Sequence, residues 1–256
     1  MIKQISEIVL EAGEIVKTGF NSTKDIKFKG EVDLVTEYDV KTEEFLKEKL
    51  QKLFPDFTII GEESNIENNN YPSEHAIFID PIDGTTNFIH GVPFVAISVG
   101  IMTEKEGRYA VVYNPILNEL YTAETGKGAY LNGSQIKVSN TSALIHSLIA
   151  TGFPYKKDNV PYLMKILEEV IYATRGVRRL GAASLDLCYT ARGIFDLYYE
   201  TRLQPWDMAG GMIILREAGG IVTKLDGRYY DMDSDSLIAS NGQIHVEFLN
   251  LLNEIK

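Results

Sequence analysis

Asp80 and Asp83 lie three residues apart in the sequence Asp-Pro-Ile-Asp-Gly-Thr-Thr-Asn-Phe. The apolar run 76–79 precedes them and predicts a buried strand. Pro81 has no N–H to give a neighbouring strand, so we expect the strand to end and the chain to turn there. Gly84 then lets the backbone bend into a short helix, whose first N–H groups are free to bind an anion. The segment therefore predicts carboxylates for cations beside N–H groups for phosphate.

Taken by itself, this segment fits an ordinary turn equally well, because Asp is common beside Gly in turns. Two more carboxylates lie at ends of predicted elements, Glu62 after a short strand and Asp207 before a helix. Asp207 also fits the N-cap of a helix that begins at Met208. Mg²⁺ prefers oxygen ligands, and two ions about 3.5–4 Å apart can bind both the attacking and the leaving oxygen of a phosphoryl transfer.

The charge balance of the chain bears on its partners. Among 256 residues, 25 Lys and Arg face 36 Asp and Glu, which gives a net charge of −11. This acidity argues against broad nucleic-acid binding, and it would repel a phosphate ester unless cations reverse the local field. Cys188 is the single cysteine, so an internal disulfide is excluded, and we expect it to be buried. With no signal peptide pattern and no apolar run of about 20 residues, we expect a cytoplasmic protein without a membrane partner.

The elements that must position these residues follow from periodicity. Apolar residues at helical spacing predict a first helix over 2–20, and Thr36 begins a second that Pro55 ends. Strands follow over 57–60, 94–101, 109–113 and 120–123, and Asn132-Gly133 predicts a hairpin. The last third alternates helices (162–172, 182–191, 208–218, 245–255) with strands (148–151, 195–199, 220–223, 237–240). We expect an α/β or α+β layered architecture, as one domain over 1–256 or divided near residue 145.

Three motifs in order resemble the inositol monophosphatase family: Gly61-Glu62-Glu63-Ser64, then 80–88, then Trp206-Asp207-Met208-Ala209-Gly210-Gly211 with Glu217-Ala218-Gly219-Gly220. A further block, Asp33-Leu34-Val35-Thr36-x-x-Asp39, is similar to that family as well. The resemblance extends from the first helix to about residue 250. It implies a sandwich of alternating helix and sheet layers of the sugar-phosphatase type, Mg²⁺ dependence, inhibition by Li⁺, and a homodimer.

The resemblance also implies a metal site. Glu62 and Asp80 would hold a first Mg²⁺ with the carbonyl of Ile82, and Asp80, Asp83 and Asp207 would hold a second. A third ion is left open, because Lys29 lies in the loop where the family carries a lysine near such an ion, but its spacing to Asp33 is one residue short.

Catalytic and substrate residues follow from the same resemblance. Asp39 and Thr85 would orient and deprotonate the attacking water, with Glu62 as the third catalytic residue. The N–H groups of Gly84 and Thr85 would bind phosphate. The substrate hydroxyls would contact Ala183, Glu200 and Asp207. An alternative for Glu200 is a surface carboxylate at the end of a strand.

The implied reaction is hydrolysis of inositol 1-phosphate, or a related polyol or sugar phosphate, by direct attack of a metal-activated water. The same chemistry on fructose 1,6-bisphosphate, NADP or histidinol phosphate is an alternative. Arg178 and Arg179 would then meet a second phosphate, whereas otherwise they would lie at a dimer interface. An aspartyl-phosphate mechanism of the haloacid-dehalogenase type needs two acidic residues two positions apart, whereas Asp80 and Asp83 are three apart. A binding role in transcription or ribosome assembly is the alternative outside catalysis.

Overall fold

The computed structural model describes residues 1–23, 26–28, 34–64, 75–154, 159–232, 234 and 236–255. The helices are α1 (Ile2–Phe20), α2 (Glu37–Leu53), α3 (Thr85–His90), α4 (Val160–Ala173), α5 (Ala183–Ala191), α6 (Pro205–Glu217) and α7 (His245–Glu254), with a 3₁₀ turn at Leu144–His146. None of the helices in these ranges has the length and apolar character needed to span a bilayer.

The strands of the described residues form three sheets. A hairpin pairs β1 (Ile26–Phe28) with β2 (Leu34–Thr36). The larger sheet has the order of its sequence, β3 (Thr58–Gly61), β4 (His75–Asp83), β5 (Ala96–Thr103), β6 (Glu106–Asn114), β7 (Glu119–Glu124), β8 (Ala129–Leu131) and β9 (Ser134–Ile136). The second sheet has the order β11 (Gly176–Arg178), β10 (Leu148–Thr151), β12 (Leu197–Thr201), β14 (Ser236–Ser240) and β13 (Ile221–Thr223).

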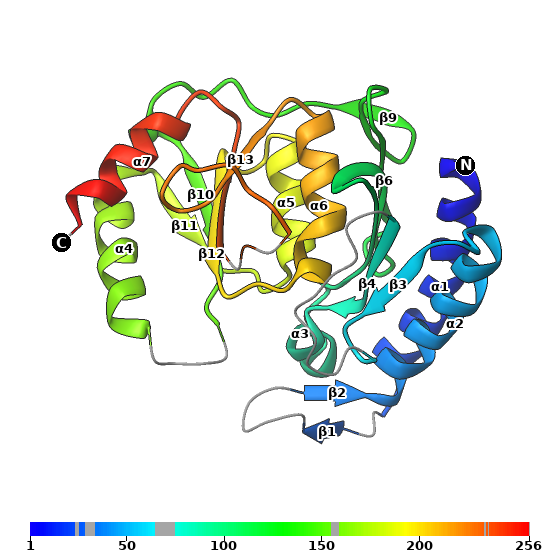
Figure 1. Cartoon of the computed structure of the whole chain (residues 1–256). Helices are drawn as coiled ribbons and strands as arrows, with labels where there is room; N and C mark the ends of the chain where they lie inside the picture. The colour runs from blue at the N-terminus through cyan, green and yellow to red at the C-terminus, as the bar shows by residue number, and fades with distance from the viewer. Residues whose placement is uncertain are drawn as a thin grey trace.

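Helices and sheets alternate in layers (Figure 1). The antiparallel pair α1 and α2 covers one face of the larger sheet, and α5 and α6 lie between the two sheets. On the far side, α4 and α7 cover the second sheet. The predicted sandwich of alternating layers is confirmed. The strands of the seven-stranded sheet precede residue 145 in the sequence, and those of the five-stranded sheet follow it. The helices α5 and α6 share one buried core with both sheets.

The strand β4 is buried on both faces. Ile77 and Ile79 point into the core beneath α1 and α2, whereas Ala76 and Phe78 belong to the core around α5 and α6. Because successive side chains of a strand alternate between faces, a strand covered by helices on both sides is apolar throughout. The continuous apolar run in the sequence therefore did predict its burial.

The expectation that Pro81 ends this strand was wrong. The strand β4 continues to Asp83, and its pairing with β5 joins Asp80 to Ser98 and Asp83 to Ala96. Three steps along β4 thus match two steps along β5, which is a β-bulge. A bulge leaves one residue outside the ladder, so a proline without an N–H is tolerated there.

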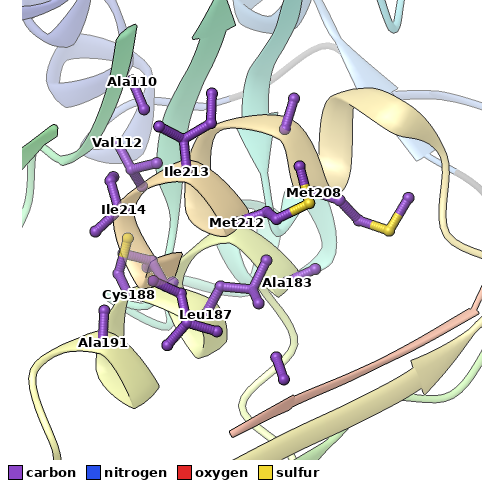
Figure 2. Close-up of a cluster of buried hydrophobic side chains, with 14 of the residues drawn as sticks. Ala110, Val112, Ala183, Leu187, Cys188, Ala191, Met208, Met212, Ile213 and Ile214 are labelled. Carbon is purple, nitrogen blue, oxygen red and sulfur yellow. The ribbon is translucent and has the colours of Figure 1, made fainter. Parts of the chain in front are cut away.

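Glycines let α6 approach its neighbours closely. Gly100 of β5 faces α6, and an added Cβ there would lie 2.5 Å from the Cβ of Ala209. Gly210 and Gly211 give the same close approach on the helix side, toward Ser98 and Leu187. Figure 2 shows the apolar side chains of α6 interleaved with those of α5, among them Met208, Met212, Ile213 and Ile214 beside Leu187, Cys188 and Ala191. The expected burial of Cys188 is confirmed.

Most element boundaries follow the predicted periodicity, with two differences in the last third of the chain. Sequence analysis did not predict β11, whose three residues form the edge of the second sheet. The helix expected to begin at Met208 begins at Pro205, because Pro is favoured in the first turn of a helix.

Gly100→Ala should therefore destabilise the protein. The new methyl group would overlap Ala209, and its other near neighbours are backbone atoms that cannot rotate away. We expect a loss of about 1–3 kcal/mol in the free energy of unfolding, measured by urea denaturation. Gly176→Ala is the control, because an added Cβ there meets no atom closer than 3.5 Å, and a change within about 0.5 kcal/mol is expected. Equal losses in the two variants would contradict this account of the packing.

Candidate active site

The end of β4 places Asp80 and Asp83 in the interior, 2% and 7% exposed. Asp80 Oδ1 accepts a hydrogen bond from the N–H of Ile82 at 3.1 Å, within the bulge. Gly84 follows with φ of +91°, a left-handed conformation that favours glycine, and it begins α3. The bulge and this glycine together direct both carboxylates and the first N–H groups of α3 to one place.

Asp80 is surrounded by other carboxylates. Burial raises its pKa well above the usual range, and the negative charges of Glu62, Asp83, Asp207 and Asp39 raise it further, in that order. These acidic residues come from separate elements that only the fold brings together. A cation held among them would reverse this effect, because it favours the charged form of each carboxylate.

Asp83 joins β4 to the start of α5. Its carboxylate accepts hydrogen bonds from the N–H of Ala183 at 3.1 Å and from the N–H of Ser184 at 2.7 Å. The Ser184 hydroxyl donates to the same carboxylate at 2.5 Å. Burial raises the pKa of Asp83 to about 6, and these hydrogen bonds act in the opposite direction. Asp83 thus binds the free N–H groups of a helix start that lies 100 residues further along the chain.

Asp207 lies in the first turn of α6, so the alternative that it is the N-cap residue was wrong. Gln204 is the N-cap residue, and its N–H donates to Asp207 Oδ2 at 2.7 Å. A carboxylate three residues after the cap reaches back to it in this way in a capping box. Burial and then the charge of Glu62 raise the pKa of Asp207 well above its ordinary value, while the bond from Gln204 lowers it.

Asp39 and Thr85 are in contact, as the resemblance implied. Asp39 is fully buried in the first turn of α2, and Thr36 donates to its Oδ2 through both N–H and hydroxyl, at 2.8 and 2.6 Å. Its Oδ1 faces the Thr85 hydroxyl at 3.2 Å. The same hydroxyl lies 3.1 Å from the carbonyl oxygen of Ile82. The Thr85 hydroxyl is therefore held between two acceptors.

Glu62 begins the turn that follows β3. Its N–H donates to the carbonyl of Ile79 in β4 at 3.1 Å, which holds this turn beside the end of β4. The parallel pairing of β3 with β4 places Gly61 opposite Ile79, so the chain leaves β3 at Glu62 beside Asp80, the next residue of β4. Sheet geometry thus explains why Glu62 lies near Asp80.

Glu200 belongs to the strand β12 and is half-buried, so it is not a fully exposed surface carboxylate. Tyr198 donates a hydrogen bond to its Oε2, and Gly152 lies against the carboxylate so closely that a Cβ there would overlap it. Burial raises the pKa of Glu200 to about 7, whereas the Tyr198 bond and the positive charge of Arg179 lower it. Arg179 is an exposed residue, and the effect of its charge on Glu200 shows that it lies near the site.

The predicted site residues that lie within the described ranges come together around the end of β4. Within the described ranges, however, no three His, Cys, Asp or Glu side chains converge to hold an ion as they stand. Asp80, Asp83 and Asp207 each have an oxygen bonded to a backbone N–H. A cation would compete with those N–H groups for the carboxylate oxygens. Lys29 and Asp33 lie outside the described residues.

Sequence analysis missed three residues that organise the site. Ser184 bonds Asp83, and a serine in the first turn of a predicted helix was the available signal. Asn87 donates at 2.8 Å to both Phe94 and Leu180 and so joins α3 to the segment before α5. Asp186 is a buried acid whose pKa is raised by burial and by the charge of Glu200, and no local pattern indicated its burial.

Comparison with known proteins identifies the family of this chain. The family model described as "Inositol monophosphatase family" matches residues 1–256. The chain belongs to the inositol monophosphatase family. Members of this family are metal-dependent, and the family supports a phosphatase that acts on a phosphorylated substrate.

Relatives and solved structures agree with this assignment. The chain is 40% identical over 262 residues to inositol monophosphatase 3 of Solanum lycopersicum, covering 99% of this chain and 98% of that one. It is 40% identical over 239 residues to a protein of Aquifex aeolicus named fructose-1,6-bisphosphatase/inositol-1-monophosphatase, and the match covers 92% of this chain and 89% of that one. The solved structure of the extragenic suppressor protein suhB from Bartonella henselae matches with a TM-score of 0.90 and 37% identity, covering 97% and 96%.

The raised pKa of Glu200 predicts a pH-dependent effect of Glu200→Gln in metal-free protein. Between pH 4.5 and about 7 the folded protein keeps a proton on Glu200 that the unfolded chain releases, so stability falls as pH rises through that window. Gln keeps an oxygen for the Tyr198 bond and carries no charge. We expect its Tm to exceed that of the wild type at pH 8 by clearly more than at pH 5, as measured by thermal melts in EDTA. The same difference in Tm at both values would show that Glu200 titrates normally.

Proposed function

We propose that this protein is a Mg²⁺-dependent phosphomonoesterase that hydrolyses inositol 1-phosphate or a closely related polyol phosphate. The single observation that carries the proposal is the cluster of buried and half-buried acidic residues around Asp80, next to the start of α3. Carboxylates crowded in this way need cations, and a helix start offers N–H groups to an anion. A phosphate ester with divalent cations satisfies both requirements at once.

The donor set fits Mg²⁺. All of the candidate side chains are carboxylates, and the carbonyl of Ile82 adds a neutral oxygen, which is the chemistry that a hard cation prefers. We assign one ion to Glu62, Asp80 and Ile82, and a second to Asp80, Asp83 and Asp207. When bound, such ions make water a stronger nucleophile and stabilise the oxygen that leaves phosphorus.

Thr85 and Asp39 accept the proton of the attacking water in this proposal. The Thr85 hydroxyl can accept a hydrogen bond from water while its own proton faces Asp39 Oδ1. Asp39 Oδ2 is held by two bonds from Thr36, so Oδ1 stays directed at Thr85. Asp39 is thus a general base that acts through a hydroxyl. Water oxygen attacks phosphorus directly, and no covalent enzyme intermediate forms.

Phosphate and substrate hydroxyls would lie on opposite sides of the carboxylates. The N–H groups of Gly84 and Thr85 would bind phosphate oxygens, because the first N–H groups of a helix have no partner within it. On the other side, Glu200 and the N–H of Ala183 would meet the hydroxyls. That N–H bonds Asp83 in the structure, so it would be shared with a bound substrate.

Fructose 1,6-bisphosphate is the second candidate substrate, because the relative from Aquifex aeolicus carries that activity in its name. Arg179 favours it as well. Its guanidinium lies so close to Gly181 that a Cβ there would overlap it, and its charge acts on Glu200. An exposed arginine beside Gly181 could pair with a second phosphate of the substrate. In the alternative role, Arg179 and Arg178 would lie at a dimer interface.

We further propose that the protein is a cytoplasmic homodimer, that Li⁺ inhibits it, and that residues 1–256 act as one domain. The shared core of α5 and α6 with both larger sheets supports a single unit, since separating the halves would expose it. A third ion near Lys29 and a binding role in transcription or ribosome assembly stay predictions.

Release of inorganic phosphate tests the proposed function. Purified protein should release phosphate from inositol 1-phosphate with Mg²⁺, lose this activity in EDTA, and be inhibited by Li⁺. Fructose 1,6-bisphosphate, NADP and histidinol phosphate are measured side by side, and the highest kcat/KM identifies the preferred class. Mg²⁺-loaded protein that is inactive on all four compounds would overturn the proposal.

Thr85→Ala tests the proton relay. Removing the hydroxyl separates Asp39 from the attacking water, so we expect kcat to fall by about 10²–10⁴ with little change in KM. Thr85→Ser is the matched control, because it keeps the hydroxyl and should retain most of the activity. If the alanine and serine variants lost activity equally, the methyl group and not the hydroxyl would be the important feature.

A further inference from the structure

Glu43 is a buried acidic residue of α2 that the proposed mechanism does not use. Its side chain is 3% exposed, although a carboxylate is rarely buried without a reason. It lies four residues after Asp39, so both side chains project from the same face of the helix. Asp39 meets Thr85, and Glu43 meets the turn that follows β3.

The contact of Glu43 with that turn is specific. Glu43 Oε2 accepts a hydrogen bond from the N–H of Glu63 at 2.7 Å. The carboxylate also fills the space beside Gly61, where a Cβ would overlap it. Gly61 has no left-handed φ that would require glycine. Its lack of a side chain is therefore explained by the position of the Glu43 carboxylate.

These contacts enclose Glu62. The residue before it lies against the Glu43 carboxylate, and the residue after it donates to the same carboxylate. The N–H of Glu62 itself is bonded to Ile79 of β4. The backbone of Glu62 is thus held from two sides, by a helix and by a strand, which fixes the direction in which its side chain leaves.

A weaker contact on the same helix supports this arrangement. Lys47, one turn after Glu43, donates to the hydroxyl of Ser64 at 2.9 Å, and its amine is 4.0 Å from Glu43 Oε1. The side chain of Lys47 is 36% exposed, so solvent screens this interaction. Glu43, which is buried, carries most of the constraint.

We propose that Glu43 is a positioning residue that fixes the Gly61–Ser64 turn so that Glu62 reaches the metal cluster. This inference rests on the proposed function, because it assumes that Glu62 is a Mg²⁺ ligand. One rigid helix then sets the distance between the water-activating pair, through Asp39, and the first metal position, through Glu43. Residues that orient metal ligands typically change metal affinity by about 10–100-fold when they are removed.

Mg²⁺ titration by isothermal calorimetry tests this role with Glu43→Ala. Alanine leaves the N–H of Glu63 without its acceptor and leaves space beside Gly61. We expect the Kd for Mg²⁺ to rise about 10-fold or more. The KM for inositol 1-phosphate at saturating Mg²⁺ should stay within about twofold of the wild-type value, because Glu43 positions the metal ligand Glu62 and does not contact the substrate. Glu44→Ala is the matched control, since Glu44 is an exposed residue of the same type on the same helix, and its affinity should equal that of the wild type.

Two conservative variants separate positioning from a general structural role. Glu43→Gln keeps an oxygen for the Glu63 N–H and should restore most of the Mg²⁺ affinity, whereas Glu43→Asp keeps the charge but is too short to reach it. If Glu43→Ala does not fold, the comparison of the Asp and Gln variants decides. A lower Tm with wild-type Mg²⁺ affinity would overturn the inference. Wild-type protein that binds no Mg²⁺ would instead overturn the metal site on which it rests.

Discussion

Repulsion among buried carboxylates at the end of β4 is the constraint on which the rest of the structure depends. Asp80 has the charges of Glu62, Asp83, Asp207 and Asp39 around it, and burial weakens the screening that water would give. Backbone N–H groups partly offset this repulsion by donating to the carboxylates. They come from the bulge itself, from the start of α5 and from the cap of α6. Such partial neutralisation leaves a strong preference for cations, which is what a phosphatase of this family requires.

Close packing in the middle layer makes this crowding possible. The helix α6 approaches β5 at Gly100 and α5 at Gly211, so its first turn carries Asp207 to the end of β4. A wider separation would move that carboxylate away from Asp80. The same layer joins the two larger sheets through one core, so the site lies where elements from both halves of the chain meet. Packing in the core and the chemistry at the edge are therefore coupled.

Helix α2 is the second element that positions groups of the candidate site. Asp39 in its first turn and Glu43 one turn later face the same direction, and both are buried beside the candidate site. Because a helix is stiff over two turns, the positions of Thr85 and of the turn carrying Glu62 are related to each other through it. The sheet positions Asp80 and Asp83, whereas α2 positions the groups that act beside them.

The sequence by itself determined the types of elements and the layered class, and it singled out the acidic residues of the candidate site, because apolar period and motif order are local properties. It also indicated that β4 is buried, since the apolar run has no polar face. It did not determine that β4 passes through Pro81, because a bulge depends on how β5 pairs with it. Nor did it predict that Asp83 bonds Ser184, or that Glu43 holds the turn after Gly61. Those contacts join residues far apart in the chain, and only the tertiary packing decides which distant N–H a buried carboxylate will meet.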